Sequence, residues 1–170
     1  MELEKVMKER YSVRSFQDQP IEKEKLEELL KVLSIAPTAV NAQPVRVYVL
    51  ASSEALEKIE KLARTYQAKS VLLIAVDTEK VWKNPVEKEY NTSDMDGSIA
   101  CTYFMLKAWE LGIGSVWIRY FNSREVKEAF SLPEHIQPIC LLALGYPSED
   151  SEPSPRHIEK QPLENLITYL

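Results

Sequence analysis

The spacing of apolar positions along the chain predicts two long helices. Between residues 21 and 36, leucines recur at intervals of three and four, which places them on one face of a helix that ends before Pro37. These leucines are Leu26, Leu29, Leu30 and Leu33. Residues 94–111 predict the longest helix, and Gly112 is its expected C-terminal stop. This helix has so little polar surface that we expect it to be buried, either centrally or between subunits.

Shorter segments carry weaker helical patterns. The first, over residues 3–10, has its apolar positions on one side. A second is expected over 54–65, with Ser53 as its N-cap. A third starts at a capping-box-like pair, Asn122 and Glu125.

Four segments have the composition of strands, and they alternate with the helices. They are residues 45–50, 71–76, 114–118 and 139–144. Segment 71–76 is continuously apolar, so we expect a central strand covered on both faces. Residues 78–92 are polar and irregular, which indicates a flexible connection or a lid. Because helices and strands are interleaved, we expect a mixed α and β class.

Length and charge narrow the classes of protein. The 170 residues, 45% of them hydrophobic, are enough for one domain with a real core. A net charge of −5 argues against a general nucleic-acid surface, so any anion site must be a local basic cluster. The chain shows no apolar leader and no stretch long enough to span a membrane, and we expect a cytoplasmic protein. Cys101 and Cys140 lie in apolar surroundings and are expected to be buried, reduced thiols.

Several kinds of site are excluded by what the chain lacks. Four glycines are too few for a dinucleotide fingerprint or a phosphate-binding P-loop. The two histidines and two cysteines are widely separated and have no zinc-type spacing, so no metal site is expected.

The segment from Arg10 to Arg14 is the clearest candidate for an anion site. In an extended strand, Arg10, Ser12 and Arg14 project from one side, and Tyr11 and Val13 from the other. Two guanidiniums and a hydroxyl on one side match the oxygens of a phosphate. A helix would also bring the arginines together but would turn Ser12 away. Two solvated arginines after a helix remain the competing interpretation.

A second polar cluster lies in the loop between Pro37 and Pro44. It holds the hydroxyl of Thr38 and the carboxamides of Asn41 and Gln43, directly before an expected strand. Carboxamides both donate and accept hydrogen bonds, so they suit a ring edge with alternating carbonyl and N–H groups. The alternative is a turn in which Asn41 bonds its own backbone.

In their order along the chain, these motifs resemble the nitroreductase family of FMN-dependent oxidoreductases. Arg-x-Ser-x-Arg is followed by Ala-Pro-Thr-Ala-x-Asn-x-Gln-Pro, then by Asp-Gly opening the long helix, and by Leu-Gly-Ile-Gly-Ser-Val-Trp-Ile, Leu-Pro and Leu-Gly-Tyr-Pro. The resemblance implies an α+β fold in which helices flank a mainly antiparallel sheet. It also implies one domain over 1–170, with 148–170 as a C-terminal extension, assembled as a homodimer with FMN at the interface.

The resemblance assigns site residues in three groups. Arg10, Ser12 and Arg14 would hold the FMN phosphate, completed by Lys160 or Arg156. Tyr11 stands where the family often has an arginine, which would place more weight on those C-terminal residues. The loop residues Pro37, Thr38, Ala39, Asn41 and Gln43 would contact the flavin, most of them from the partner subunit. Trp117, Ile118 and Arg119 would lie along the ring, with a backbone N–H near Arg119 directed to flavin N5.

The activity implied by the resemblance is ping-pong transfer of reducing equivalents. NADH or NADPH would reduce the flavin, and a nitroaromatic, quinone or similar small acceptor would reoxidise it, with no catalytic acid or base side chain. The alternatives are a related FMN enzyme with another reaction, such as a dehydrogenase, dehalogenase or flavin-consuming enzyme, or a flavin-binding module without catalysis. The core remains an alternative place for the Trp117 side chain. The long cation of Arg119 could stabilise reduced flavin, bind an acidic substrate or point to solvent.

Overall fold

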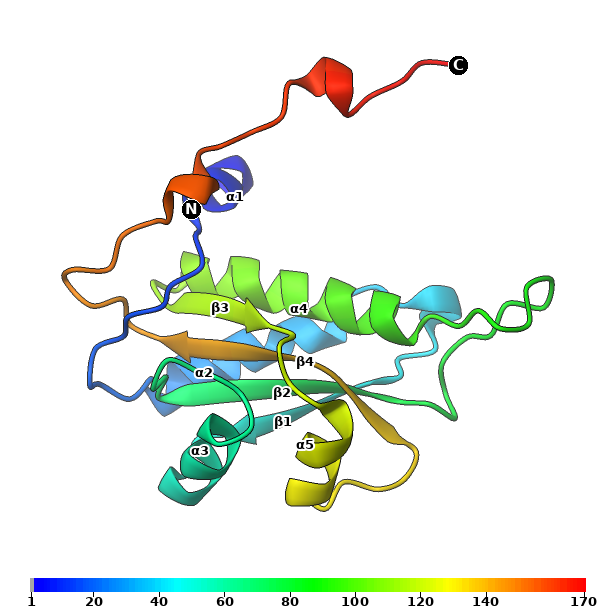
Figure 1. Cartoon of the computed structure of the whole chain (residues 1–170), viewed down its shortest axis with the longest axis horizontal. Coiled ribbons are helices and arrows are strands. Elements are labelled where there is room, and N and C mark those ends of the chain that lie inside the picture. The colour runs from blue at the N-terminus through cyan, green and yellow to red at the C-terminus, as the bar shows by residue number, and fades with distance from the viewer. Residues whose placement is uncertain (1) are drawn as a thin grey trace.

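Four antiparallel strands form the centre of the computed structural model, which describes residues 2–170 (Figure 1). Their spatial order is β1 (Val45–Leu50), β2 (Ser70–Asp77), β4 (Ile136–Gly145) and β3 (Gly114–Ile118). Each neighbouring pair runs antiparallel. Every residue of β2 is buried, as its continuous apolar run predicts. The expected class, α+β with a mainly antiparallel sheet, is confirmed.

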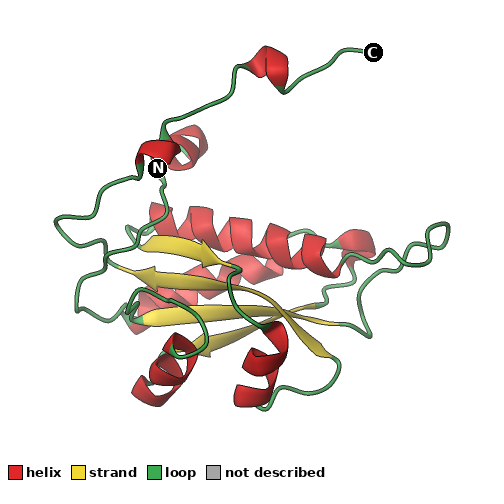
Figure 2. Ribbon diagram, in the orientation of Figure 1, coloured by secondary structure: helices red, strands yellow, loops and turns green. Residues whose placement is uncertain are grey.

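Helices cover both faces of this sheet (Figures 1 and 2). One face packs against α4 (Ser93–Glu110), α2 (Lys23–Leu30) and the short helix η1 (Lys31–Ser34). The other face packs against α3 (Ser53–Glu60) and α5 (Ser123–Ala129). Side chains of β2 alternate between the two cores, because successive residues of a strand point to opposite faces. The helix α1 (Leu3–Glu9) lies against α4, and the chain then passes along the β3 edge.

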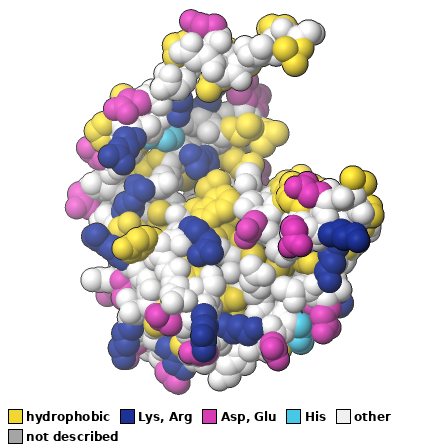
Figure 3. Space-filling view, turned by 45° about the vertical axis from the view of Figure 1, so that its right-hand side comes forward, with side chains coloured by type: hydrophobic (Ala, Val, Ile, Leu, Met, Phe, Trp, Pro, Cys, Tyr) yellow, Lys and Arg dark blue, Asp and Glu magenta, His cyan; other side chains and the backbone are white. Residues whose placement is uncertain are grey.

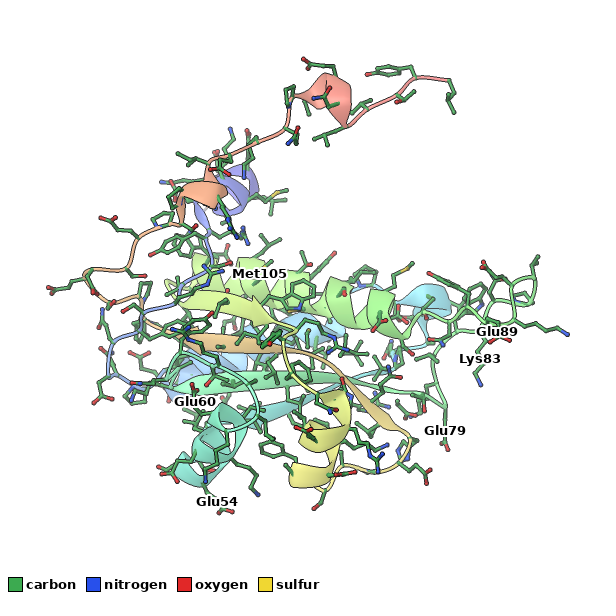
Figure 4. All side chains as sticks on the ribbon, viewed as in Figure 1. Glu54, Glu60, Glu79, Lys83, Glu89 and Met105 are labelled. Carbon is green, nitrogen blue, oxygen red and sulfur yellow. The ribbon has the colours of Figure 1, made fainter. Side chains whose placement is uncertain are left out.

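Two segments project from the body. Residues 78–92 extend beyond the start of α4, where Figure 4 labels Glu79, Lys83 and Glu89. The C-terminal segment contains η3 (Pro155–His157) and η4 (Leu163–Asn165), and it stands away from the sheet beside α1 (Figure 1). All residues from 158 to 170 are exposed. Within the described part of the chain, no helix combines the length and the apolarity that a membrane crossing requires.

The bounds of three elements differ from the sequence expectation by more than one residue. The helix expected over 21–36 is α2 followed by the tighter turn of η1, so only Leu29 of its leucine stripe is fully buried. The N-cap of α3 is Ser52, not Ser53, since Ser52 Oγ accepts from the Ala55 N–H at 3.2 Å. α3 also ends at Glu60 rather than near residue 65, because the Glu60 carboxylate accepts from the Thr65 N–H and closes a turn.

The third difference is at β4, which begins three residues before the expected segment 139–144. Its extra residues include Pro138, which has no N–H to donate. A shift in the pairing with β2 between Ile74 and Ala75 accommodates this proline. The two cysteines, by contrast, are as expected: both are free thiols and both are buried.

Candidate functional site

The segment that follows α1 is extended, and its side chains alternate as the sequence predicts. Tyr11 and Val13 are buried, whereas Arg14 is exposed and Ser12 is partly exposed. The backbone is fixed at the sheet edge, because Ser12 bridges Ser115 of β3 and the Val13 N–H donates to the Ser115 carbonyl at 3.0 Å. The side of this segment that carries Arg10, Ser12 and Arg14 therefore faces outward, with two guanidiniums and one hydroxyl.

Tyr11 brings the C-terminal extension to this strand. Its hydroxyl donates to the Ser151 carbonyl at 2.9 Å, and its ring meets Trp109 of α4 edge-on at 5.3 Å between centroids. The His157 ring lies edge-on to the same tyrosine at 6.4 Å. Tyr11 thus joins the N-terminal strand, the end of α4 and the segment carrying η3.

The result is a basic cavity of about 630 Å³, which we call the clamp cavity. It is lined by Arg10, Tyr11, Ser12, Arg14, Ser154, Arg156, His157 and Lys160. The structure thus brings both C-terminal candidates, Arg156 and Lys160, to the predicted N-terminal group. His157 and Ser154 were not predicted, because nothing in the polar segment 148–161 marks them locally. This donor set of guanidiniums, an ammonium and hydroxyls is suited to a phosphate.

The arginines of the clamp cavity are held without carboxylate partners. Arg10 Nη1 lies 3.5 Å from the sulfur of Met105, which Figure 4 labels on α4, and Arg14 Nη1 donates to the Ser12 carbonyl at 3.2 Å. Of the chain's seven arginines, within residues 2–170 only Arg46 and Arg124 form ion pairs with carboxylates. An acidic protein thus leaves guanidinium charge free on one surface.

Two further cavities are related to the clamp cavity through shared lining residues. The first, about 520 Å³, shares Arg14 with it and is also lined by Arg64, Tyr66, Gln67 and Lys69, among others. Tyr66 and Gln67 have positive φ angles of 59° and 57° in the turn that follows α3. The Arg64 guanidinium lies over the Tyr66 ring at 4.9 Å. Sequence reasoning missed this turn because it extended the helix to residue 65.

The next cavity, about 740 Å³, shares Arg64 with the one before it; we call it the distal cavity. Arg119 is one of its lining residues. Its guanidinium stacks 5.1 Å from the Phe121 ring and donates to the Phe121 carbonyl at 3.5 Å. Shared residues therefore link three cavities in series, from the clamp cavity through Arg14 and Arg64 to Arg119.

The side chains of Trp117 and Ile118 lie outside these cavities. Trp117 is partly buried and packs against the core facing α4. Ile118 is buried in the core on the other face of the sheet. Core packing, the alternative given for Trp117, therefore describes its side chain. The backbone after β3 remains the candidate for a contact with a ligand in the distal cavity.

The carboxamide loop lies at the other end of α4. The Ala39 N–H donates to Asp96 Oδ1 at 3.0 Å, and Asn41 Oδ1 accepts from Gln43 Nε2 at 3.1 Å. Thr38 Oγ1 accepts from the Gln43 N–H at 3.0 Å. A separate cavity of about 480 Å³ includes Thr38, Asn41 and Gln43 in its lining, while Pro37 and Ala39 are not among its lining residues. The loop is strained: the φ angles of Val40, Asn41 and Gln43 are 48°, 57° and 51°.

Within one chain, the loop and the clamp cavity are far apart. The loop contacts Asp96 in the first turn of α4, whereas Tyr11 contacts Trp109 in its last turn. Asp96 and Trp109 are thirteen positions apart in this α-helix, a distance of about 20 Å at 1.5 Å per residue. One chain therefore presents the two predicted halves of the site at opposite ends of its longest helix.

Comparison with known proteins gives consistent matches over most of the chain. The sequence profile described as the nitroreductase family matches residues 7–65 and 60–146. A crystal structure of a nitroreductase family protein from Clostridium difficile 630 is 41% identical, covers 99% of this chain and 98% of its own, and superimposes with a TM-score of 0.93. An FMN-dependent nitroreductase from Clostridium difficile R20291 is 28% identical with a TM-score of 0.72, over 88% of this chain and 90% of its own. The FMN reductase [NAD(P)H] of Bacillus subtilis is 27% identical over 99% of this chain and 75% of its own length.

Proposed function

Because this chain belongs to the nitroreductase family, we propose that it is an NAD(P)H-dependent oxidoreductase with FMN as its cofactor. Reducing equivalents would pass from the nicotinamide to a nitroaromatic, a quinone or a similar small acceptor. The two substrates would use one face of the flavin in turn, which is a ping-pong sequence. Bound FMN would supply the redox chemistry by accepting a hydride equivalent and releasing two electrons.

The observation that carries this proposal is the clamp cavity. FMN ends in a phosphate dianion, which requires fixed cationic donors. Arg10, Arg14, Arg156 and Lys160 line one cavity together with the Ser12 hydroxyl. Within residues 2–170, none of these cations forms an ion pair with a carboxylate, so no acidic side chain neutralises their charge and it is available to a ligand. The residues present therefore fit the phosphate end of the cofactor.

The order of the three cavities supports a placement for the rest of the cofactor. With the phosphate in the clamp cavity, the ribityl chain would pass Arg14 and the ring would lie towards Arg64 and the distal cavity. The backbone N–H near Arg119 would then donate to flavin N5, which would favour the reduced, more negative ring. No acid or base side chain is needed, since the chain's contribution is position and charge.

The loop Pro37–Gln43 would complete the site from a second copy of the chain. In a two-fold dimer packed along α4, the start of one α4 would lie beside the end of the other, so each loop would approach the partner's FMN site on the side of the ring. An exposed apolar groove of about 430 Å³, lined by Leu3, Met7, Ile35 and Tyr103 among others, runs along this helix. Hydrophobic side chains also gather in the hollow beneath the C-terminal arm (Figure 3). Both surfaces support a homodimer.

Steady-state turnover tests this function. Under anaerobic conditions, FMN-loaded protein should oxidise about one equivalent of NADH or NADPH per flavin on its own, and should turn over further nicotinamide only when a nitroaromatic or quinone acceptor is present. Initial rates at several acceptor concentrations should give parallel double-reciprocal plots, the signature of a ping-pong sequence. Rapid flavin reduction without turnover of any acceptor would favour a different reaction within the family. Flavin that nicotinamides do not reduce would favour a binding module.

A further inference from the structure

We propose that the distal cavity selects acceptors that carry an anionic group on an aromatic ring. This inference rests on the proposed function, because it places the acceptor at the far end of the FMN site. It concerns the residues that remain once a phosphate has been matched to the clamp cavity. The donors of that cavity already suffice for one phosphate, so the cations beyond it serve another charge.

Three cations lie around the distal cavity. They are Lys61, Arg64 and Arg119, and all three are exposed. In the described part of the chain, none of them lies within ion-pair distance of a carboxylate. Surface cations of this protein are commonly paired along helices, as Arg124 is with Glu128 of α5 at 2.8 Å. Three unpaired cations around one cavity therefore form a local positive field.

The single carboxylate in the lining does not neutralise this field. Glu60 Oε2 accepts from both the N–H and the hydroxyl of Thr65, so it faces the turn that follows α3. Figure 4 labels Glu60 at this end of α3. One engaged carboxylate thus stands against three free cations, and the cavity has a net positive lining.

The same cavity offers aromatic surface. Tyr120 is 94% exposed, and Phe121 already carries the Arg119 guanidinium on its ring. A free aromatic face beside a guanidinium binds flat rings by stacking and an attached carboxylate or sulfonate by charge-assisted hydrogen bonds. Leu62 and Ala63 add apolar walls. The combination favours an acidic aromatic over a neutral one of equal size.

The reaction balances for such an acceptor. An aromatic nitro group takes two electrons and two protons to give the nitroso compound and water. NAD(P)H supplies both electrons and one proton as a hydride equivalent, and solvent supplies the second proton. The anionic group takes no part in this chemistry, so its effect is confined to binding and orientation.

The test uses the oxidative half-reaction alone. FMN-loaded protein is reduced anaerobically with dithionite, excess reductant is removed, and reoxidation is followed by stopped flow. The two acceptors are para-nitrobenzoate and the neutral para-nitrobenzamide, which has nearly the same shape. For each variant, the measured quantity is the second-order rate constant for para-nitrobenzoate divided by that for para-nitrobenzamide. This ratio is then compared with the wild-type ratio. This comparison cancels the intrinsic difference in reactivity between the acceptors.

We expect Arg119→Gln to lower this ratio about tenfold, the scale of one charge-assisted hydrogen bond. Arg119→Lys should restore part of it, and Lys61→Gln should lower it less. The matched control is Arg124→Gln, which removes the same charge from α5 outside the cavity and should leave the ratio unchanged. Added salt should lower the wild-type ratio, because the cations are exposed.

Three results would overturn the inference. The first is a ratio that Arg119→Gln and Arg124→Gln change equally. The second is loss of FMN from Arg119→Gln, measured by flavin absorbance per protein, which would assign Arg119 to the cofactor. The third is an unchanged ratio with slower reduction by NADPH, which would assign the cavity to the dinucleotide. Wild-type protein that binds no FMN would instead contradict the proposed function.

Discussion

The buried carboxylate of Asp96 holds the backbone of Ala39. Its Oδ1 accepts from the Ala39 N–H at 3.0 Å, and its Oδ2 accepts from the Thr92 hydroxyl at 2.7 Å. Ala39 begins the strained loop whose carboxamides are proposed to reach the flavin of the partner. One side chain in the first turn of α4 therefore fixes the position of the loop that we propose to act at another chain's site.

We expect Asp96→Ala to destabilise the fold and weaken FMN binding. It leaves the Ala39 N–H and the Thr92 hydroxyl without their acceptor, at a cost of about 1–3 kcal/mol in the free energy of unfolding. Urea unfolding and FMN titration measure the two effects. Asp94→Ala is the control, because Asp94 lies exposed in the same turn. It should cost only about 0.3–1 kcal/mol, through the helix dipole, and should leave FMN affinity unchanged. Equal effects of the two variants would contradict the positioning role.

The extended segment Arg10–Arg14 packs closely against Gly114 through Val13. A Cβ at this position would lie 2.7 Å from Val13 Cγ2 and 3.0 Å from Pro147 Cγ. Gly114→Ala should therefore push the strand that carries Ser12 and Arg14, and should lower both thermal stability and FMN affinity. Gly112→Ala is the matched control: its φ of 75° costs stability, about 1 kcal/mol, but nothing lies within 4 Å of the added Cβ. If FMN affinity fell equally in both variants, displacement of the segment with Ser12 and Arg14 would not be the cause of the weaker binding.

Arg10 and Arg14 should each contribute to FMN affinity. Replacing either by alanine removes a charged hydrogen bond to the phosphate, which is worth about 1.5–3 kcal/mol, or a rise in Kd of about ten-fold or more. Fluorescence titration of the apoprotein with FMN gives these constants. Arg124→Ala, a change of equal charge on α5, should leave the Kd unchanged. FMN binding that neither arginine variant weakens would make the phosphate assignment wrong.

The two buried thiols should be inert in the native protein. Burial raises the pKa of Cys101 well above 9.0, with a further contribution from the neighbouring Cys140 thiol. A thiol reagent should label neither cysteine until guanidinium unfolds the chain. As the pH rises above about 9, the unfolded chain loses this proton before the folded protein does, so the free energy of unfolding should fall with pH in that range. Cys101→Ala should make this fall shallower. Rapid labelling of the native protein would contradict the burial.

Local patterns predicted the parts of the fold that depend on neighbouring residues. The alternation in Arg10–Arg14 was enough to predict which of its side chains point outward. The apolar run of Val71–Val76 was enough to predict a central strand. The clamp cavity was predicted through the order of several motifs, which brought Arg156 and Lys160 to the N-terminal strand. No local pattern could supply the Tyr11–Ser151 hydrogen bond that makes this contact.

The remaining parts depend on contacts that the sequence does not display. α3 ends early because a side chain of its last turn, Glu60, bonds Thr65, and the turn that results carries Arg64 into the line of cavities. Arg119 was predicted beside the ring without a direction for its side chain. The structure places it on Phe121, facing the turn after α3.

The central claim is that this chain binds FMN and that nicotinamides reduce it, and an absorbance spectrum tests it most directly. Purified protein reconstituted with FMN and freed of excess should be yellow and carry about one flavin per chain, as expected when each protomer contributes one clamp cavity. Anaerobic addition of NADH or NADPH should bleach the flavin absorbance, and a nitroaromatic acceptor should restore it. Protein that stays colourless after incubation with FMN would contradict the account.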